Sequence, residues 1–401
     1  MKKVLVVINT LGHAGAETAL LELLRRLDPE KYEVSLYVLM GQGELVHELP
    51  GHVKLLNKHY DDHSVLSGEG RGHMRRQVLK AMMNRGTVLR LFPYLVKNLA
   101  AMAARGRILP DKLLWRVLSD GGQRFHDRYD LAVAYLEGGS AYYVADHVNA
   151  DKKAVFLHVD YGRAGYTRGL DRDCYLKYDK VFTVSDEVKK AFLKVYPECV
   201  ERTDVFHNLL DQQAIRRKAG LPGGFTDDYA GIRILTVGRL TAQKAFEISI
   251  EAMRLLKDAG EKVRWYVLGE GDQRGMLEER IRRLHLEEDF LLLGAVRNPY
   301  PYMAQTDIYV HASRFEGKSI AIQEAQTLGC AILVSDCSGN REQVIPGEDG
   351  MMCGLTPEDI CNGVRELIRD EEKRKKLGNA ASRKKITDGT EIDKLLSLMG
   401  E

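Results

Sequence analysis

The stretch RILTVGRLTAQK, residues 233–244, contains the unit on which the fold is built. Residues 233–237 have the pattern of a buried strand, Gly238 permits a tight exit from it, and a helix is expected over residues 246–259. The same succession of strand pattern, small-residue turn and helical pattern recurs along the chain. This alternation predicts parallel sheets with helices on both faces.

The alternation occurs twice, which predicts two domains in a chain of 401 residues. Strands are expected in the first half at residues 3–9, 33–40, 53–56, 129–136, 153–158 and 180–184, and residues 204–207 end this half. Strands are expected in the second half at residues 233–237, 262–268, 290–293, 308–311 and 331–334. Helices are expected at residues 16–27, 185–196, 246–259 and 273–284, from about residue 140, and in the charged tail after residue 357.

Residues 208–230 are rich in Gly, Pro and Asp and predict a linker between domains at residues 1–207 and 231–384. Ligands of open parallel sheets bind outside the carboxyl ends of the strands. We therefore expect an α/β architecture of two doubly wound, Rossmann-like domains that face a central cleft.

Composition is that of a soluble globular protein, with 44% hydrophobic and 29% charged residues. The six cysteines include no C-x-x-C pair, so we expect reduced thiols in a cytoplasmic protein and no zinc site. The N-terminal apolar run is read as a strand rather than a signal peptide. No segment approaches the roughly 20 apolar residues of a membrane-spanning helix.

Residues 71–128 form a basic segment with a helical pattern, expected to break near Gly86, Pro93 and Pro110. It contains 13 Lys and Arg against three acids, a local charge of +10, while the whole chain carries +2, so the remainder carries about −8. One hypothesis is an amphipathic helix on an anionic lipid surface. The alternative is a helical elaboration with a solvated basic face. Nucleic acid is not expected as a partner, because no recognised binding motif accompanies the charge.

A second motif, SRFEGKSIAIQEA at residues 313–325, places Glu316 and Glu324 eight positions apart. Between them, a Gly-Lys-Ser turn opens a helix, and unpaired backbone N–H groups at a helix start form an anion site. Glu324 then lies more than one turn into the helix, free to hold hydroxyl groups. The alternative is a capped surface helix with two solvated glutamates.

Arg239 and Lys244 flank the expected helix start after residue 237. A cation there is unfavourable beside the helix dipole unless an anion lies between them, and the pair suits a pyrophosphate. The alternative is a surface loop with two solvated cations. Further on, Gly269 and Gly271 permit close backbone approach, but no G-x-G-x-x-G dinucleotide motif is present.

In the first half, the loop at residues 11–17 can present the backbone amides of Gly15 and Ala16 to a phosphate, although close helix packing explains it equally well. His158 ends an expected strand, where it can bond to a reacting sugar or be structural. Asp171-Arg172-Asp173 matches a D-x-D metal motif, but it lies in a polar loop and is interpreted as surface.

The ordered set of motifs resembles the retaining GT-B-fold glycosyltransferases of family 4, also called glycosyl transferases group 1. The resemblance covers nearly the whole chain outside residues 57–128. It rests on Gly15–Glu17, Leu157–Asp160, Val184-Ser185, Gly238-Arg239-Leu240 with Lys244, Gly269–Gly271, Gly294, the E-x7-E pair Glu316 and Glu324, residues 338–342 and residues 347–350.

The resemblance implies a role for each motif residue. Arg239 and Lys244 hold the donor diphosphate, Glu316 contacts the transferring sugar, and Glu324 binds the ribose. Further donor contacts are implied for Gly15, Ala16, Gly238, Gly269, Gly317, Lys318, Ser319 and Ile320. His158 faces the donor sugar and the acceptor. A C-terminal helix at about residues 385–401 joins the N-terminal, acceptor-side domain.

The implied activity is that of a retaining hexosyltransferase, which needs neither a cofactor nor a divalent metal. It moves a sugar from a nucleotide-diphosphate sugar, with UDP favoured over GDP, to a glycan or lipid-linked acceptor in cell-surface polysaccharide synthesis. The expected location is cytoplasmic and peripheral, at the inner face of the plasma membrane. A nucleotide-sugar epimerase of the same fold and a non-catalytic nucleotide-sugar-binding protein are the alternatives. Two departures leave donor preference open: Ala14-Gly15 replaces the usual Gly-Gly, and Lys318-Ser319 replaces Phe-Gly.

Overall fold

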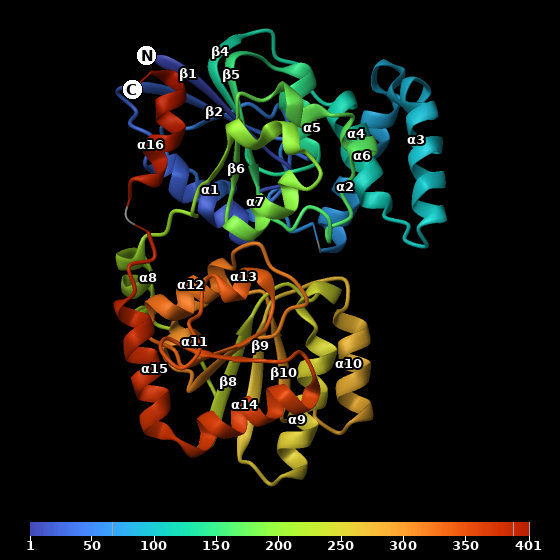
Figure 1. The fold of residues 1–401 in the computed structure, drawn as a ribbon. Helices are drawn as coiled ribbons and strands as arrows, with labels where there is room; N and C mark the ends of the chain where they lie inside the picture. Colours follow the sequence, from blue (N-terminus) through green and yellow to red (C-terminus); the bar gives the residue numbers. More distant parts are fainter. Residues whose placement is uncertain (66, 388, 401) are drawn as a thin grey trace. The chain divides into compact units, whose positions relative to one another are not determined.

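The computed structural model describes residues 1–65, 67–387 and 389–400. The chain divides into two compact units (Figure 1). Unit 1 is formed by Met1–Leu209 and by the described residues from Gly389 onward, and unit 2 by the described residues between them.

Unit 1 is built on a parallel sheet of seven strands in the order β3-β2-β1-β4-β5-β6-β7. The strands are β1 (Lys2–Ile8), β2 (Tyr32–Val38), β3 (Lys54–Leu55), β4 (Arg128–Ala134), β5 (Asn149–Leu157), β6 (Lys180–Thr183) and β7 (Thr203–Val205). The helices are α1 (Gly15–Arg25), α2 (Gly68–Met83), α3 (Thr87–Ala104), α4 (Pro110–Gly121), α5 (Gly139–His147), α6 (Arg168–Asp171), α7 (Asp186–Leu193) and α16 (Glu391–Leu396).

Unit 2 repeats the same winding with six parallel strands in the order β10-β9-β8-β11-β12-β13. The strands are β8 (Ile232–Val237), β9 (Val263–Leu268), β10 (Phe290–Gly294), β11 (Ile308–His311), β12 (Ile332–Ser335) and β13 (Met351–Cys353). The helices are α8 (Gln212–Ala219), α9 (Phe246–Asp258), α10 (Arg274–Arg283), α11 (Tyr300–Ala304), α12 (Ile320–Thr327), α13 (Ser338–Arg341), α14 (Pro357–Arg369) and α15 (Glu371–Arg383).

Apolar side chains on the strands explain why both sheets lie inside their units. In β1, Val4 to Ile8 are all buried, and in β8 Ile234 and Leu235 are fully buried. Continuous apolar strands of this kind belong to sheets covered on both faces. The predicted α/β fold with two Rossmann-like domains is confirmed, and the cleft between them stays a prediction.

The structure adds to or differs from the local predictions at three places. Residues 208–230, expected to be a linker, contain α8, whose Gln212 side chain donates to Thr327 Oγ1 and Lys384 O. Helix α3 continues through Pro93, where a break is expected from sequence. The short strand β13 has no sequence prediction at all. The expected breaks near Gly86 and Pro110 are present, since α3 begins at Thr87 and α4 at Pro110.

Helices α2, α3 and α4 occupy the basic segment of unit 1. Helix α5 contacts the sheet, α4 packs on α5, and α2 and α3 pack on α4, so α3 lies in an outer layer of the unit (Figure 1). Among the helices of the described chain, none combines the length and the apolar character needed to cross a bilayer.

The C-terminal residues of the described chain return to unit 1. Lys394 Nζ in α16 donates to Val205 O over 2.8 Å, and the His207 amide donates to Glu391 Oε2 over 3.1 Å. These bonds fix α16 beside β7.

Candidate functional site

The carboxyl edge of the unit 2 sheet gathers the predicted donor-binding residues of that unit. Strand β8 ends at Val237, and the parallel strands β9 and β11 end beside it at Leu268 and His311. Gly238, Gly269 and the loop after His311 therefore come to one edge of the sheet, where ligands of such sheets bind.

A buried cluster of charged and polar side chains lies at this edge. Lys244 Nζ is 2.6 Å from Glu316 Oε1 and 3.0 Å from His311 Nε2. His311 Nε2 is 3.2 Å from the same Glu316 oxygen. Glu316 is 6% exposed and His311 1% exposed, so the ion pair is shielded from water. The predicted residues Lys244 and Glu316 are thus direct partners.

The protonation states follow from this packing. Burial opposes ionisation of Glu316, but the Lys244 ammonium and His311 hold the pKa of its carboxyl well below the usual range. Burial, and then Lys244, lower the pKa of His311. Glu316 is therefore a carboxylate and His311 a neutral imidazole at neutral pH.

Two neighbouring residues bind the loop of Lys244 to the loop of Glu316. Gln243 Nε2 donates to Phe315 O over 2.8 Å, and the Arg314 amide donates to Gln243 O over 2.9 Å. Lys244 ends the 3-10 turn η5 (Ala242–Lys244), just before α9. The cluster is consequently held by two loops that are bonded to each other.

Arg239 differs from Lys244 in being exposed. Its guanidinium has no hydrogen bond or ion pair with any residue of the described chain, although its backbone O accepts from the Thr241 amide. An exposed, unengaged guanidinium directly after a sheet strand can bind an anion without first breaking an internal contact.

The predicted glycines Gly238 and Gly269 lie at a close approach of two loops. A Cβ on Gly269 would stand 1.9 Å from Gly238 O, and one on Gly271 would stand 2.1 Å from Leu240 O. Gly269 also has a φ of +155°, which side chains rarely adopt. Here the Gly-x-Gly pattern is explained by backbone packing beneath Arg239.

Helix α12 begins directly after the predicted Gly-Lys-Ser turn. Ser319 precedes its first residue, Ile320, without a capping bond from the serine side chain, so the first-turn amides keep their hydrogen-bonding capacity. Gly317 is buried and Lys318 half-buried. A Cβ on Gly339 would stand 2.6 Å from Gly317 O, so α13 packs tightly on this turn.

Glu324 lies in α12 and is 7% exposed. Tyr300 OH donates to Glu324 Oε1 over 2.8 Å. Burial raises the pKa of the carboxyl to about 7, although the tyrosine bond works in the opposite direction. Glu324 therefore titrates near neutral pH, which makes its capacity to accept hydroxyl hydrogen bonds depend on pH.

In unit 1, the predicted residues lie after β1 and β5. Gly15 begins α1 and Ala16 follows it, and no side chain caps this helix start either. The His158 amide donates to Glu137 Oε2 over 3.0 Å. Burial lowers the pKa of the His158 imidazole to about 4, and its Nε2 has no hydrogen-bond partner among the described residues. His158 is therefore neutral at physiological pH.

The interpretation of the D-x-D sequence as surface is wrong for Asp171, which is fully buried. Tyr142 OH donates to Asp171 Oδ1 over 2.7 Å, and Arg116 Nη2 donates to Asp171 O over 2.8 Å. Burial raises the pKa of this carboxyl to about 7. Asp173 is exposed and pairs with Arg168, so the two aspartates do not form one site.

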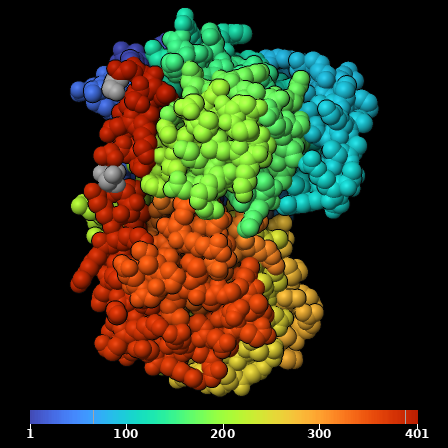
Figure 2. Space-filling view, in the orientation of Figure 1, coloured from blue at the N-terminus to red at the C-terminus, as the bar shows by residue number. Residues whose placement is uncertain are grey.

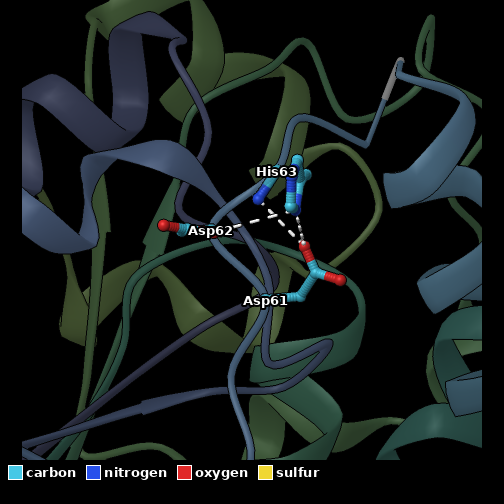
Figure 3. A group of neighbouring side chains, drawn as sticks. All are labelled: Asp61, Asp62 and His63. Carbon is cyan, nitrogen blue, oxygen red and sulfur yellow. Dashed lines mark hydrogen bonds and ion pairs between the residues drawn. The ribbon is translucent and has the colours of Figure 1, made fainter.

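Asp61, Asp62 and His63 are a different group that could hold a metal, because their ligand atoms lie within 4.8 Å of one another (Figure 3). His63 Nδ1 is 2.9 Å from Asp61 Oδ1, and His47 Nε2 is 2.9 Å from Asp62 Oδ2. The carboxylates thus already have histidine partners. The group belongs to unit 1, whereas the predicted donor-binding residues around Glu316 belong to unit 2. That the reaction needs no metal stays a prediction.

The family model described as glycosyl transferases group 1 matches residues 229–384. Residues 229–384 therefore resemble a glycosyl transferases group 1 domain. This domain contains the whole Lys244–His311–Glu316 cluster, together with Arg239 and Glu324. The family resemblance predicted from the motifs is therefore confirmed, whereas retention of configuration stays a prediction.

Curated relatives match over part of their length. The chain is 33% identical over 231 residues to N-acetylgalactosamine-N,N'-diacetylbacillosaminyl-diphospho-undecaprenol 4-alpha-N-acetylgalactosaminyltransferase of Campylobacter jejuni, covering 56% of this chain and 61% of that protein. It is 26% identical over 161 residues to the amylovoran biosynthesis glycosyltransferase AmsD of Erwinia amylovora, covering 40% of this chain and 45% of that protein. The chain thus spans less than two thirds of the length of these relatives.

Solved structures resemble the whole chain. Anabaena HepE in complex with UDP and glucose has a TM-score of 0.69 at 16% identity, with all of both chains covered. Sucrose-phosphate synthase from Thermosynechococcus elongatus has a TM-score of 0.65 at 14% identity, covering 100% of this chain and 96% of that one. At these identities the likeness shows the fold alone, and the predicted GT-B fold is confirmed.

Sequence reasoning missed His311, Gln243 and Tyr300. His311 ends a strand five residues before Glu316, a signal of the same kind as that used for His158. Gln243 adjoins Lys244 but bonds across to the other loop. Tyr300 lies 24 positions before Glu324, and no spacing in the sequence indicates their contact.

Proposed function

We propose that this chain is a glycosyltransferase that moves a sugar from a nucleotide-diphosphate sugar to a glycan or lipid-linked acceptor in cell-surface polysaccharide synthesis. The observation that carries the proposal is the Lys244–His311–Glu316 cluster, which lies with the unengaged Arg239 at the carboxyl edge of a group 1 domain. The names of the relatives support it, because one acts on a diphospho-undecaprenol-linked sugar and another in amylovoran biosynthesis. UDP is the favoured carrier, since HepE is solved with UDP.

The chemistry requires charge to be stabilised on the leaving diphosphate. In the proposed site, Arg239 binds that charge with a planar guanidinium, and the first-turn amides of α12 add backbone donors. Lys244 has two roles in this proposal. Its ammonium group stabilises charge on the leaving diphosphate, and its ion pair with Glu316 positions the carboxylate that contacts the sugar. Preorganised donors of this kind are often the largest catalytic contribution, and losing one costs roughly 100- to 1,000-fold.

Fixed cations replace a divalent metal in this proposal. The acceptor oxygen bonds to the anomeric carbon on the face that the diphosphate leaves, which retains the anomeric configuration. The bond from that carbon to the diphosphate oxygen breaks, and the proton of the acceptor hydroxyl passes to the departing diphosphate. Glu324 holds the ribose hydroxyls, and neutral His158 of the other unit hydrogen-bonds the transferring sugar or the acceptor without carrying charge.

The test is release of nucleotide diphosphate from UDP- and GDP-sugars by the full chain in EDTA, with and without polyprenyl-diphosphate-linked oligosaccharides. We expect release that depends on acceptor, and at least a 100-fold loss in Arg239→Ala. Conversion of the sugar without any acceptor would indicate an epimerase instead. If the folded protein neither releases nucleotide diphosphate nor converts the sugar, it is a non-catalytic binding protein. That result would contradict the proposal.

A further inference from the structure

Helix α3 has an apolar face on each side. Its inner side buries Leu91 and Met102 against the unit. Its outer side exposes large apolar side chains, with Leu89 at 82%, Phe92 at 61%, Val96 at 50% and Leu99 at 46% exposure. Steps of three, four and three residues place these four on one face of a helix. We call them the α3 stripe. A soluble helix normally presents a polar face to water, so this stripe indicates a binding surface.

Positive charge without an ion-pair partner is concentrated in the part of the chain that carries the stripe. Residues 70–110 contain no Asp or Glu and nine basic residues: Arg71, Arg75, Arg76, Lys80, Arg85, Arg90, Lys97, Arg105 and Arg107. None of the nine forms an ion pair with a carboxylate of residues 1–65, 67–387 or 389–400. Lys and Arg elsewhere on the surface are commonly paired, as Arg128 is with Asp151. This segment therefore carries an excess of positive charge without ion-pair partners.

The position of α3 leaves the stripe available. Helix α3 packs through its inner side on α4 and on Leu170 of α6, in an outer layer of unit 1. Residues around 70–110 gather at one edge of unit 1 in the space-filling view (Figure 2). Leu79 and Met83 of the adjoining α2 are also exposed, at 56% and 76%. Both α2 and α3 therefore expose large apolar side chains in a segment rich in unpaired cations.

We propose that this surface docks on an anionic phospholipid bilayer, with the α3 stripe in the acyl boundary and the flanking cations on the headgroups. A bilayer with anionic lipids offers both an apolar phase and negative charge along one plane, as the surface requires. A second copy of the chain is a poorer fit, because nine unpaired cations on each copy would face one another. Nucleic acid provides no partner for the apolar stripe.

The proposal is independent of the donor site. The stripe belongs to unit 1, whereas the Lys244–His311–Glu316 cluster belongs to unit 2. Membrane binding and nucleotide-sugar chemistry are therefore measured separately, and the failure of one leaves the other standing. If both hold, the enzyme works where a lipid-linked acceptor is concentrated.

The first test is co-sedimentation of the full chain with vesicles of phosphatidylcholine alone or with 30% phosphatidylglycerol. We expect binding to the anionic vesicles, weakened by high salt, and at least a tenfold loss in Phe92→Ser/Val96→Ser. The matched control is Met276→Ser, which removes an apolar side chain 45% exposed on α10 and leaves binding unchanged. Donor binding stays intact in all three proteins, which shows that they are folded.

The second test separates charge from apolar contact. Neutralising Lys80, Arg90 and Lys97 to Gln should lower binding to anionic vesicles at least tenfold. Neutralising the exposed Lys31, Lys58 and Lys376 changes total charge equally and should have little effect. Equal losses of vesicle binding in the two triple variants would show that net charge alone drives binding. That result would contradict the proposed surface.

The third test measures how deeply the α3 stripe enters the bilayer. Phe92→Trp places an indole in the stripe, against a background of Trp115 and the fully buried Trp265. We expect a blue-shifted emission and quenching by brominated lipids on anionic vesicles. An unchanged emission, or a solution dimer that Phe92→Ser/Val96→Ser dissociates, would overturn the membrane assignment. A protein partner that protects the stripe in place of lipid would do the same.

Discussion

Lys244 and Glu316 hold each other in an ion pair of 2.6 Å, although 72 residues separate them in the sequence. Their side chains are 13% and 8% exposed. A buried pair of this kind is costly to break from one side, because the remaining charge loses its partner. Removing only one of the two residues assigned to donor chemistry should therefore also destabilise unit 2.

The first prediction concerns that pair. Lys244→Met leaves Glu316 buried and unpaired, so it should lower the free energy of unfolding of unit 2 by about 3–5 kcal/mol. Adding Glu316→Gln should recover much of that loss, while activity stays absent. Urea unfolding followed by Trp265 fluorescence, in a Trp115→Phe background, reports on unit 2. Additive losses in the double variant would show that the pair contributes no coupling.

The second prediction separates Arg239 from Lys244. The Arg239 guanidinium is exposed and contacts no described residue, so Arg239→Ala should change stability by less than about 0.5 kcal/mol. Donor turnover should nevertheless fall roughly 100-fold or more, because the lost group binds the leaving diphosphate. The check is urea unfolding and nucleotide release on the same preparation. A stable Arg239→Ala variant with wild-type turnover would show that Arg239 does not bind the donor diphosphate.

The third prediction concerns Glu324, whose pKa is raised to about 7 by burial. Because the folded pKa lies above that of an unfolded glutamate, its contribution to stability is fully present at low pH and is lost as pH rises through about 7. Donor affinity should change in the opposite sense. Ribose hydroxyls need the carboxylate as acceptor, so nucleotide-sugar binding should weaken as pH falls below 7.

Calorimetric titration of a nucleotide sugar between pH 5.5 and 8.5 measures this effect. Glu324→Gln should bind the nucleotide sugar more weakly, and its affinity should change little with pH. Tyr300→Phe removes a hydrogen bond that lowers the pKa, so it should move the midpoint upward. A wild-type profile that matches that of Glu324→Gln would rule out the ribose role.

The fourth prediction compares two glycines. Gly269→Ala places a Cβ 1.9 Å from Gly238 O at a φ of +155°, so it should destabilise unit 2 by at least about 1–3 kcal/mol and disturb Arg239. Gly275→Ala lies in α10 with nothing within 4 Å, and it should be neutral or stabilising by up to about 1 kcal/mol. Thermal unfolding of both variants is the measurement. Equal melting temperatures would show that the Gly238 loop can move.

The sequence predicted the sheets well because their strands carry local apolar patterns that recur between turns. It indicated Arg239, Lys244, Glu316 and Glu324 as candidates because each lies in a short motif at a strand end or helix start, and their roles stay predictions. Contacts made by tertiary packing left no such pattern. Asp171 looks like a surface loop residue until Tyr142 and Arg116 cover it from other helices.

Local rules also failed where tertiary packing overrode them. Helix α8 lies in a Gly- and Pro-rich segment, yet Gln212 and Arg216 bond it to α12 and to the chain at α15. Pro93 is exposed within α3, where the helix continues on both sides because its inner face is packed. A pattern read along the chain contains neither of these long-range contacts.

The measurement that tests the central claim most directly is a thermal-shift panel of nucleotide-diphosphate sugars, in EDTA, on wild-type protein and Arg239→Ala. A ligand that binds only the folded state raises the melting temperature, and at about 100 times its Kd it contributes about 2.7 kcal/mol. We predict a shift of several degrees with one nucleotide family in the wild type and little or none in Arg239→Ala. No shift with any nucleotide sugar, or an equal shift in Arg239→Ala, would contradict the proposed donor site.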